Sequence, residues 1–314
     1  MTQDITRQLK AKFKDQLKLN ESMSGHATIG IGGPAKYYIE AREVDDLIYQ
    51  ILVARSLKIQ YQIIGGGSNI LVSDKGYDGL IIANKTNRIA LDPETNQVIC
   101  DSGVPLVRLI VFAASQNLGG MEALYGIPGT VGGAIYGNAG AHGVEIKDFL
   151  QSITVVTPGG KLATRSSSWL EPAYRETKLK RENLGLQYSI LVGRFKFLPR
   201  KSDDIQRDIN KYRTWRAEHQ PLSEKTTGSV FRNPSGSSAG PKELSAGWIL
   251  DQIGAKKTRV GKAEITKMHS NWIRNMGGAK SEDVKAIIDK LKAEAKKQYD
   301  IDLQEEIELI GTWQ

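Results

Sequence analysis

The spacing of hydrophobic residues changes along the chain between a helical period and a strand-like one, which predicts a mixture of helices and strands. In residues 1–19 apolar side chains recur at every fourth position, as on one face of a helix: Ile5, Leu9, Phe13 and Leu17. The pattern then predicts a small α/β unit with a loop at 20–33, a strand at 35–40, a helix at 44–56 and strands at 60–64, 70–73 and 79–82.

From about residue 84 the pattern changes to short apolar runs separated by turns, which predicts strands at 88–91, 97–101, 153–157 and 190–198 and a helix at 106–116. A charged helix at 201–218 is typical of a boundary between two units. Beyond it we expect helices at 246–253 and 281–299 and a strand at 307–310. Ser281 is a suitable N-cap for the helix at 281–299. The buried stripe of that helix is expected to contain Val284, Ile287, Ile288, Leu291 and Ala295.

A length of 314 residues exceeds what one small core needs and predicts two or three domains. Cys100 is the only cysteine, so no intramolecular disulfide forms, and we expect this residue to be a small buried hydrophobe. The single cysteine fits a reducing compartment. The N-terminal residues carry charge throughout, and no apolar run is long enough to span a bilayer. We therefore expect a soluble, cytoplasmic protein without membrane insertion.

The formal net charge of +8 is compatible with nucleic acid, a membrane surface or an anionic small substrate as the partner. Much of this charge lies in helices of mixed sign, and no aromatic and basic module of the usual kinds is present, so we expect no nucleic-acid partner. An anionic nucleotide substrate explains the excess equally well. The four histidines are scattered, and their spacing predicts no metal site: His26, His142, His219 and His269.

The first glycine-rich motif follows the predicted strand at 60–64 and contains Gly65, Gly66, Gly67, Ser68 and Asn69. Glycine allows backbone N–H groups to converge on a phosphate, because no Cβ blocks the approach. The motif lacks the G-x-G-x-x-G spacing, and a strand rather than a helix follows, so it is no dinucleotide fingerprint. A tight turn between strands remains the alternative to pyrophosphate binding.

A second segment, GIPGTVGGA at 126–134, continues to residue 141 and places six glycines among apolar residues. Such a backbone can press against a flat group such as a flavin, or against another strand. A third motif, GSVFRNP at 228–234, presents Ser229 after a glycine without the G-x-S-x-G pattern, which argues against an esterase triad. The acidic run LQEEI at 303–307 is by itself typical of a strand edge whose acidic side chains face solvent.

Together and in this order, these motifs resemble the UDP-N-acetylenolpyruvoylglucosamine reductase family over about residues 25–311. The resemblance also includes IGGPA at 31–35, NAGAHGVEI at 138–146, YR at 174–175, SAGWIL at 245–250 and LQEEIELIG at 303–311. It implies an α+β fold of three domains, with two FAD-binding α/β domains and an α/β substrate-binding domain. We place these at 1–83, 84–205 and 206–302, with residues from about 303 to 314 packing back on the first domain.

The resemblance implies that non-covalently bound FAD and NADPH reduce UDP-N-acetylglucosamine enolpyruvate to UDP-N-acetylmuramate, a peptidoglycan precursor, and that the protein acts as a monomer. Ser229 matches the proton donor, and Arg175 and Glu306 match its two assisting residues. Tyr174, Arg232 and Asn233 match substrate-binding positions. The residues matching flavin-binding loops are Gly65, Gly66, Gly67, Ser68 and Asn69 in one loop and Gly126, Pro128, Gly129, Thr130, Gly132 and Gly133 in the other.

This chain departs from the family pattern at three places: Gly30 stands where a basic or polar residue is frequent, Arg232 replaces a lysine, and Glu176-Thr177 follows the YR pair. A substrate-capping tyrosine is not evident, and Tyr188 is a weak candidate. Two other readings are a different FAD oxidoreductase with the same flavin domains and a non-catalytic relative. The GSVFRNP motif opposes the first, and the complete set of Ser229, Arg175 and Glu306 opposes the second.

Overall fold

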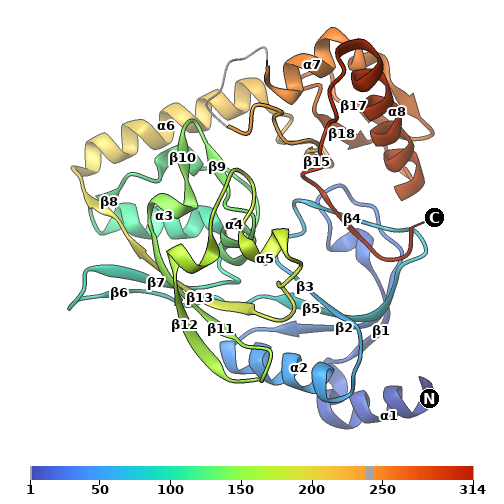
Figure 1. The fold of residues 1–314 in the computed structure, drawn as a ribbon. Coiled ribbons are helices and arrows are strands. Elements are labelled where there is room, and N and C mark those ends of the chain that lie inside the picture. Colours follow the sequence, from blue (N-terminus) through green and yellow to red (C-terminus); the bar gives the residue numbers. More distant parts are fainter. Residues whose placement is uncertain (1, 238–243, 314) are drawn as a thin grey trace.

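The structure, a computed structural model, describes residues 2–237 and 244–313. The N-terminal unit contains a four-stranded sheet in the order β1 (Lys18–Ser22), β2 (Pro34–Ala41), β5 (Tyr77–Asn84) and β3 (Tyr61–Ile64). β5 runs parallel to both β2 and β3, whereas β1 is antiparallel to β2. The helices α1 (Thr2–Phe13) and α2 (Val44–Ser56) lie below this sheet in Figure 1 and bury their apolar side chains against it.

The predicted helix over residues 1–19 is too long, and the predicted loop at 20–33 begins as a strand. α1 ends at Phe13, and Lys14 has a left-handed φ of 50°. β1 then pairs with β2, so that Lys18 lies opposite Tyr38. Leu17 continues the helical spacing and contacts the same core from outside the helix. The apolar period thus extends past the helix, because the same core accepts side chains from the helix and from Leu17 beyond its end.

The middle unit is built on an antiparallel sheet in the order β12 (Leu162–Ser166), β11 (Leu150–Val156), β13 (Ser189–Lys196), β7 (Gln97–Asp101) and β6 (Ile89–Asp92). The helices α3 (Leu106–Ser115), α4 (Val131–Tyr136) and α5 (Lys178–Arg181) accompany it, and two short pairs join β8 (Leu118–Gly119) to β14 (Leu198–Pro199) and β9 (Gly140–Ala141) to β10 (Val144–Glu145). Cys100 is buried in this core, as predicted, and burial raises the pKa of its thiol.

The long helix α6 (Ser202–His219) connects the middle unit to the C-terminal one, as Figure 1 shows. It packs on the middle unit along its length, because Ile205 and Ile209 are buried in that core and Tyr212 and Trp215 contact His142. The expected boundary between residues 205 and 206 therefore falls inside a continuous helix.

The C-terminal unit packs α7 (Ala246–Gln252) and α8 (Ser281–Tyr299) against a sheet in the order β15 (Thr226–Ser229), β18 (Trp272–Asn275), β17 (Ala263–Ile265) and β16 (Arg259–Val260). The buried face of α8 contains the five residues predicted for it. The N-cap is Lys280 and not Ser281, whose hydroxyl accepts a hydrogen bond from Asp74 N at 2.8 Å. This serine therefore joins α8 to the N-terminal unit.

The last strand, β19 (Glu308–Ile310), returns to the N-terminal unit and pairs in parallel with β4 (Ile70–Val72). Ile310 packs beside Tyr38 and Val72 in a small core of that unit. The C-terminal unit is thus connected to the rest through α6 on one side and β19 on the other (Figure 1). None of the helices in the described residues is long and apolar enough to cross a membrane.

Candidate active site

A cavity of about 570 Å³ lies where the three units meet, and each unit contributes to its wall. The N-terminal unit supplies the loop Gly65–Asn69, and the middle unit supplies residues of the second glycine segment and Arg175. The C-terminal unit supplies Ser229 and Asn271, and the segment before β19 supplies Glu306. The two glycine motifs and the proposed acid–base residues therefore share one site, although the sequence separates them widely.

The two glycine loops lie face to face in this wall. A Cβ atom at Gly65 would lie 2.3 Å from Thr130 Oγ1, and one at Gly66 would lie 3.1 Å from Gly129 Cα. Ser68 Oγ donates a hydrogen bond to the Pro128 carbonyl at 3.1 Å and joins the loops directly. These close approaches leave almost no room for a Cβ, so the glycines allow the two loops to pack together as one part of the cavity wall.

The backbone N–H groups of Gly66, Gly67 and Ser68 have no acceptor among the described residues. Free amides beside a cavity form the concave arrangement that binds phosphate oxygens. The residues present therefore fit the pyrophosphate of FAD, and Gly65–Asn69 together with Pro128, Gly129, Thr130 and Gly133 would line the site that holds it. Neither Gly126 nor Gly132 lies in the lining: Gly126 packs on Arg216, and Gly132 packs on Ser102.

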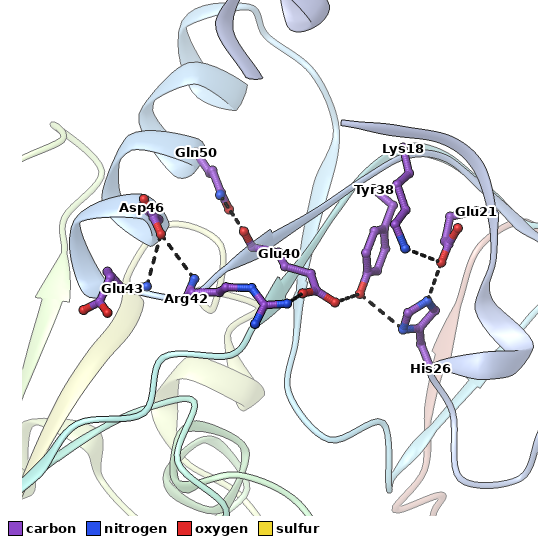
Figure 2. A network of polar contacts seen from close by, with 9 residues as sticks. All are labelled: Lys18, Glu21, His26, Tyr38, Glu40, Arg42, Glu43, Asp46 and Gln50. Carbon is purple, nitrogen blue, oxygen red and sulfur yellow. Dashed lines mark hydrogen bonds and ion pairs between the residues drawn. The ribbon is translucent and has the colours of Figure 1, made fainter. Parts of the chain in front are cut away.

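A polar network supports the first loop from behind, and Figure 2 shows its members. His26 Nε2 donates to Glu21 at 3.0 Å, and its Nδ1 lies 3.2 Å from the hydroxyl of the fully buried Tyr38, which donates to Glu40. The carbonyl of His26 lies only 1.9 Å from where a Cβ of Gly67 would be, and Gly67 has a φ of 66°. The network thus fixes the backbone against which the glycine loop folds.

Arg175 and Glu306 form an ion pair in the wall, with 3.0 Å between Arg175 Nε and Glu306 Oε1. The Nη1 atom of Arg175 is buried without an acceptor, so part of the guanidinium is free for a bound anion. Burial raises the pKa of Glu306, although the charge of Arg175 opposes this shift. A carboxyl group with a raised pKa beside a partly unpaired guanidinium is an arrangement found at catalytic sites.

Ser229 lies at the end of β15, in a segment whose backbone is fixed from both sides. On one side, Val230 N donates to the Asn271 carbonyl at 2.9 Å. The Asn271 side chain also accepts from Phe231 N at 2.9 Å and donates to the Phe231 carbonyl at 2.8 Å. On the other side, Glu306 N donates to the Val230 carbonyl at 2.7 Å. The serine and the glutamate are therefore held by one continuous backbone network.

Of the three predicted substrate-binding residues, Tyr174 and Asn233 line the cavity and Arg232 does not. Asn233 N donates to the Tyr174 hydroxyl at 3.3 Å, and the Asn233 side chain accepts from Ala246 N at the start of α7. The guanidinium of Arg232 contacts Glu176, with 2.9 Å between Nη1 and Oε2. The weak candidate for a capping tyrosine, Tyr188, packs on Trp169 and is also outside the lining.

Among the residues of the wall that sequence reasoning missed are Arg216 and His269. Arg216 is 5% exposed and donates to the Tyr125 carbonyl and to Gln220 Oε1, but it pairs with no carboxylate among the described residues. Burial, together with the charge of Arg175, lowers its pKa to about 10. His269 Nδ1 accepts from Asn271 N, and burial lowers the pKa of its ring. Arg216 was hidden within a charged helix, where nothing distinguishes it from its exposed neighbours.

Comparison with known proteins supports the same division of roles. Residues 35–166 match the family model of an FAD binding domain, and residues 220–310 match that of the C-terminal domain of UDP-N-acetylenolpyruvoylglucosamine reductase. With the glycine-lined cavity, these matches define the chain as an FAD-dependent oxidoreductase. The expected cofactor FAD is thereby confirmed, and so is the α+β fold.

The UDP-N-acetylenolpyruvoylglucosamine reductase of Halalkalibacterium halodurans is 34% identical over 98% of this chain and 99% of its own length. The Bacillus subtilis reductase is 31% identical and covers 98% of each chain. The crystal structure of the reductase from Thermus caldophilus superposes with a TM-score of 0.76 at 28% identity, over 94% of this chain and 98% of the other. The chain therefore belongs to the UDP-N-acetylenolpyruvoylglucosamine reductase family, as the motifs implied.

Proposed function

We propose that this enzyme reduces the enolpyruvyl group of UDP-N-acetylenolpyruvoylglucosamine to give UDP-N-acetylmuramate for peptidoglycan synthesis, with NADPH as the source of hydride. The observation that carries the proposal is the convergence of Ser229, Arg175 and Glu306 on the cavity that the glycine loops line. Bound against those loops, FAD would supply the redox chemistry that carries a hydride from NADPH to the substrate. No histidine or cysteine lies within either loop, so we propose that the flavin is held without a covalent bond.

The residues of this chain provide charge stabilisation and a proton. Hydride addition to the terminal carbon of the enolpyruvyl group moves an electron pair toward the carbon that bears the carboxylate. The buried guanidinium of Arg175 stabilises this negative charge, and its unpaired Nη1 is available for a carboxylate oxygen. Ser229 then gives its proton to the same carbon as a general acid, which completes the reduction of the double bond. Glu306 holds Arg175 and, when protonated, is a second donor.

The wall beyond these residues is suited to an anionic nucleotide. The buried guanidinium of Arg216 has no carboxylate partner among the described residues, so a bound diphosphate would provide its counter-charge. The Tyr174 hydroxyl accepts from Asn233 N and keeps its own proton for a substrate oxygen. We infer that Arg216, Tyr174 and Asn233 bind the substrate, and that its charge accounts for the basic composition.

We also propose that the chain functions as a monomer in the cytoplasm, with flavin-binding domains at about 1–83 and 84–205 and a substrate-binding domain at about 206–302. The pairing of β19 with β4 supports the assignment of the C-terminal residues to the first domain. One apolar core draws all its buried residues from between Val98 and Ile209, which supports a separate middle domain. Light scattering of the purified holoenzyme measures the oligomeric state directly.

Anaerobic stopped-flow absorbance of the flavin tests the proposed reaction in two steps. NADPH should bleach the flavin faster than NADH does, and the enolpyruvyl substrate should then restore its colour. In Ser229→Ala the first step should be nearly unchanged, because hydride transfer to the flavin needs no proton donor to carbon. The second step should slow by about 10²- to 10⁴-fold. Ser115→Ala, an exposed serine on α3, is the matched control and should leave both steps unchanged.

Several results would contradict parts of the proposal. A flavin that the enolpyruvyl substrate fails to reoxidise would indicate a different FAD oxidoreductase. A protein that binds no flavin on reconstitution would indicate a non-catalytic relative. If Ser229→Ala slows both steps equally, Ser229 holds the cofactor and is not the acid. If it slows neither step, the proton comes from Glu306 or from water. Denaturation should release the flavin into the supernatant, and flavin that stays on the precipitated chain would contradict non-covalent binding.

A further inference from the structure

The turn that presents Arg175 has an unfavourable backbone conformation. Ala173 and Glu176 exchange two backbone hydrogen bonds, of 2.9 and 3.2 Å, across the two residues between them. Arg175 therefore lies in a tight turn, and its φ is 56°, in the left-handed region that favours glycine. A side chain in this region costs about 1–2 kcal/mol. Such a conformation persists where the surrounding contacts determine it, and this pattern is frequent at functional sites.

Two contacts join this turn to the segment that carries Ser229. Arg232 Nη1 lies 2.9 Å from Glu176 Oε2, and Asn233 N donates to the Tyr174 hydroxyl at 3.3 Å. Tyr174 and Glu176 are the two neighbours of Arg175 in the chain, and Arg232 follows Ser229 by only three positions. The contacts therefore connect the middle and C-terminal units at the point where their catalytic residues face one cavity.

Glu176 is also fixed within the middle unit. Its Oε1 atom lies 3.4 Å from Arg181 Nη1, on the helix α5. Burial acts to raise the pKa of Glu176, but the adjacent guanidinium groups of Arg232 and Arg181 hold it below its usual range, so the carboxylate stays charged. The carboxylate thus bridges one arginine of its own unit and one arginine of the C-terminal unit. Arg232 has no such second carboxylate partner among the described residues.

We propose that Glu176 and Arg232 are positioning residues, whose ion pair fixes the Arg175 turn relative to the segment that carries Ser229. This inference rests on the proposed function, because it concerns the distance between the guanidinium that stabilises the substrate carboxylate and the hydroxyl that protonates the adjacent carbon. It also gives a role to Arg232, which stands where the family pattern has a lysine. Arg232 then acts through Arg175 rather than by contact with the substrate.

The expected effect of breaking the pair is on geometry more than on stability. Both side chains are about a quarter exposed, and pairs of this kind contribute little to folding. In contrast, a displacement of about 1 Å between reacting groups costs on the order of 100-fold in rate. We therefore expect Glu176→Gln and Arg232→Gln to lower the rate of flavin reoxidation by the substrate by about tenfold to a hundredfold. Flavin reduction by NADPH, which does not use Ser229, should stay within about twofold.

The experiment is a double-mutant cycle on the holoenzyme, followed by stopped-flow absorbance of each step. Because the two changes remove one contact, the double variant should be no slower than the slower single variant. The contact joins a single nitrogen to a single oxygen, so Arg232→Lys should retain most of the rate that Arg232→Gln loses. Glu171→Gln is the matched control, because Glu171 pairs with Lys178 and Arg181 but not with the C-terminal unit. It should leave both steps unchanged.

Fully additive losses in the double variant, or an equal loss in Glu171→Gln, would overturn the proposal. An equal loss in both steps would show that the pair only stabilises the fold, and circular dichroism of the isosteric Glu176→Gln checks that reading. These outcomes differ from a failure of the proposed function, in which the wild-type flavin would not be reoxidised by the enolpyruvyl substrate at all. A wild-type enzyme that is reoxidised, with variants that match it, would overturn the positioning role alone.

Discussion

Asn271 offers a sharp test of how the site is built, because its side chain replaces a strand in pairing with Phe231. The amide forms hydrogen bonds of 2.9 and 2.8 Å with the N–H and carbonyl of Phe231, and both residues are nearly fully buried. Each buried backbone group left without a partner costs about 1–3 kcal/mol. Asn271→Ala should therefore lower the free energy of unfolding by about 2–6 kcal/mol. We expect a loss of about 2–3 kcal/mol, because water in the adjacent cavity can reach the vacated space.

Asn271→Asp separates hydrogen bonding from packing, since aspartate has nearly the same shape. Its carboxylate can still accept from Phe231 N but places a second acceptor against the Phe231 carbonyl, so the variant should lose at least as much stability as Asn271→Ala. Protonation restores the missing donor. The pKa of the new carboxyl should therefore be higher in the folded state than in the unfolded state. The destabilisation should be complete well above that pKa and should diminish as the pH falls.

Urea unfolding followed by tryptophan fluorescence, at several pH values, measures these differences if the slope with denaturant is unchanged. Both variants should also slow flavin reoxidation by the substrate, because Ser229 loses one side of its support. The hydrogen-bond argument is wrong if Asn271→Asp is as stable as the wild type at neutral pH. It is also wrong if the difference in free energy of unfolding between the wild type and this variant increases as the pH falls.

Three further predictions follow from the cavity wall. Arg216→Gln should weaken the binding of UDP, measured by calorimetry, by about tenfold or more. Arg213 is an exposed arginine on the same helix, and Arg213→Gln should leave the affinity unchanged. Equal losses in the two variants would show a general charge effect. Gly66→Ala should lower the flavin content on reconstitution, because its Cβ would lie 3.1 Å from Gly129 Cα. Gly159 has open space around it, and Gly159→Ala should leave the flavin content unchanged. An unchanged content in Gly66→Ala would show that the loops are more widely spaced. Burial lowers the pKa of His269, so its contribution to stability is complete above about pH 6.5 and diminishes as the pH falls toward its folded pKa. The thermal midpoint of His269→Gln should therefore depend less on pH in that range, and an identical profile would contradict the assignment.

The helices with a regular apolar stripe were predictable residue by residue. The helices predicted at 44–56 and 281–299 have these bounds in the structure, because each buries its apolar side chains in one core. The predicted strands also match, apart from one to three residues at several ends. Other elements were not predicted, among them β1 and α4. The first is polar and depends on pairing with β2, and the second lies among glycines that disfavour a helix locally.

The candidate site was also only partly predictable from the sequence. The glycine loops, Ser229, Arg175 and Glu306 were visible as motifs, and their meeting at one cavity depends only on the fold. Arg216, Asn271 and His269 were not visible as ligand-facing residues, because a polar residue in a helix or a loop shows its role only when its neighbours are known. The ion pair between Glu176 and Arg232 joins units far apart in the sequence, so no local pattern reveals it.

The pairing of β19 with β4 has a consequence for the order in which the enzyme is made. β4 is synthesised early, but its partner strand and Glu306 are among the last described residues to leave the ribosome. Until then Ile70–Val72 lacks its partner strand, and the Asn69 side chain lacks the Glu306 carbonyl to which it donates. Contacts between such distant segments form slowly. The nascent chain can thus assemble its flavin-binding loops before it holds a complete set of catalytic groups, and it gains activity only when the last strand is in place.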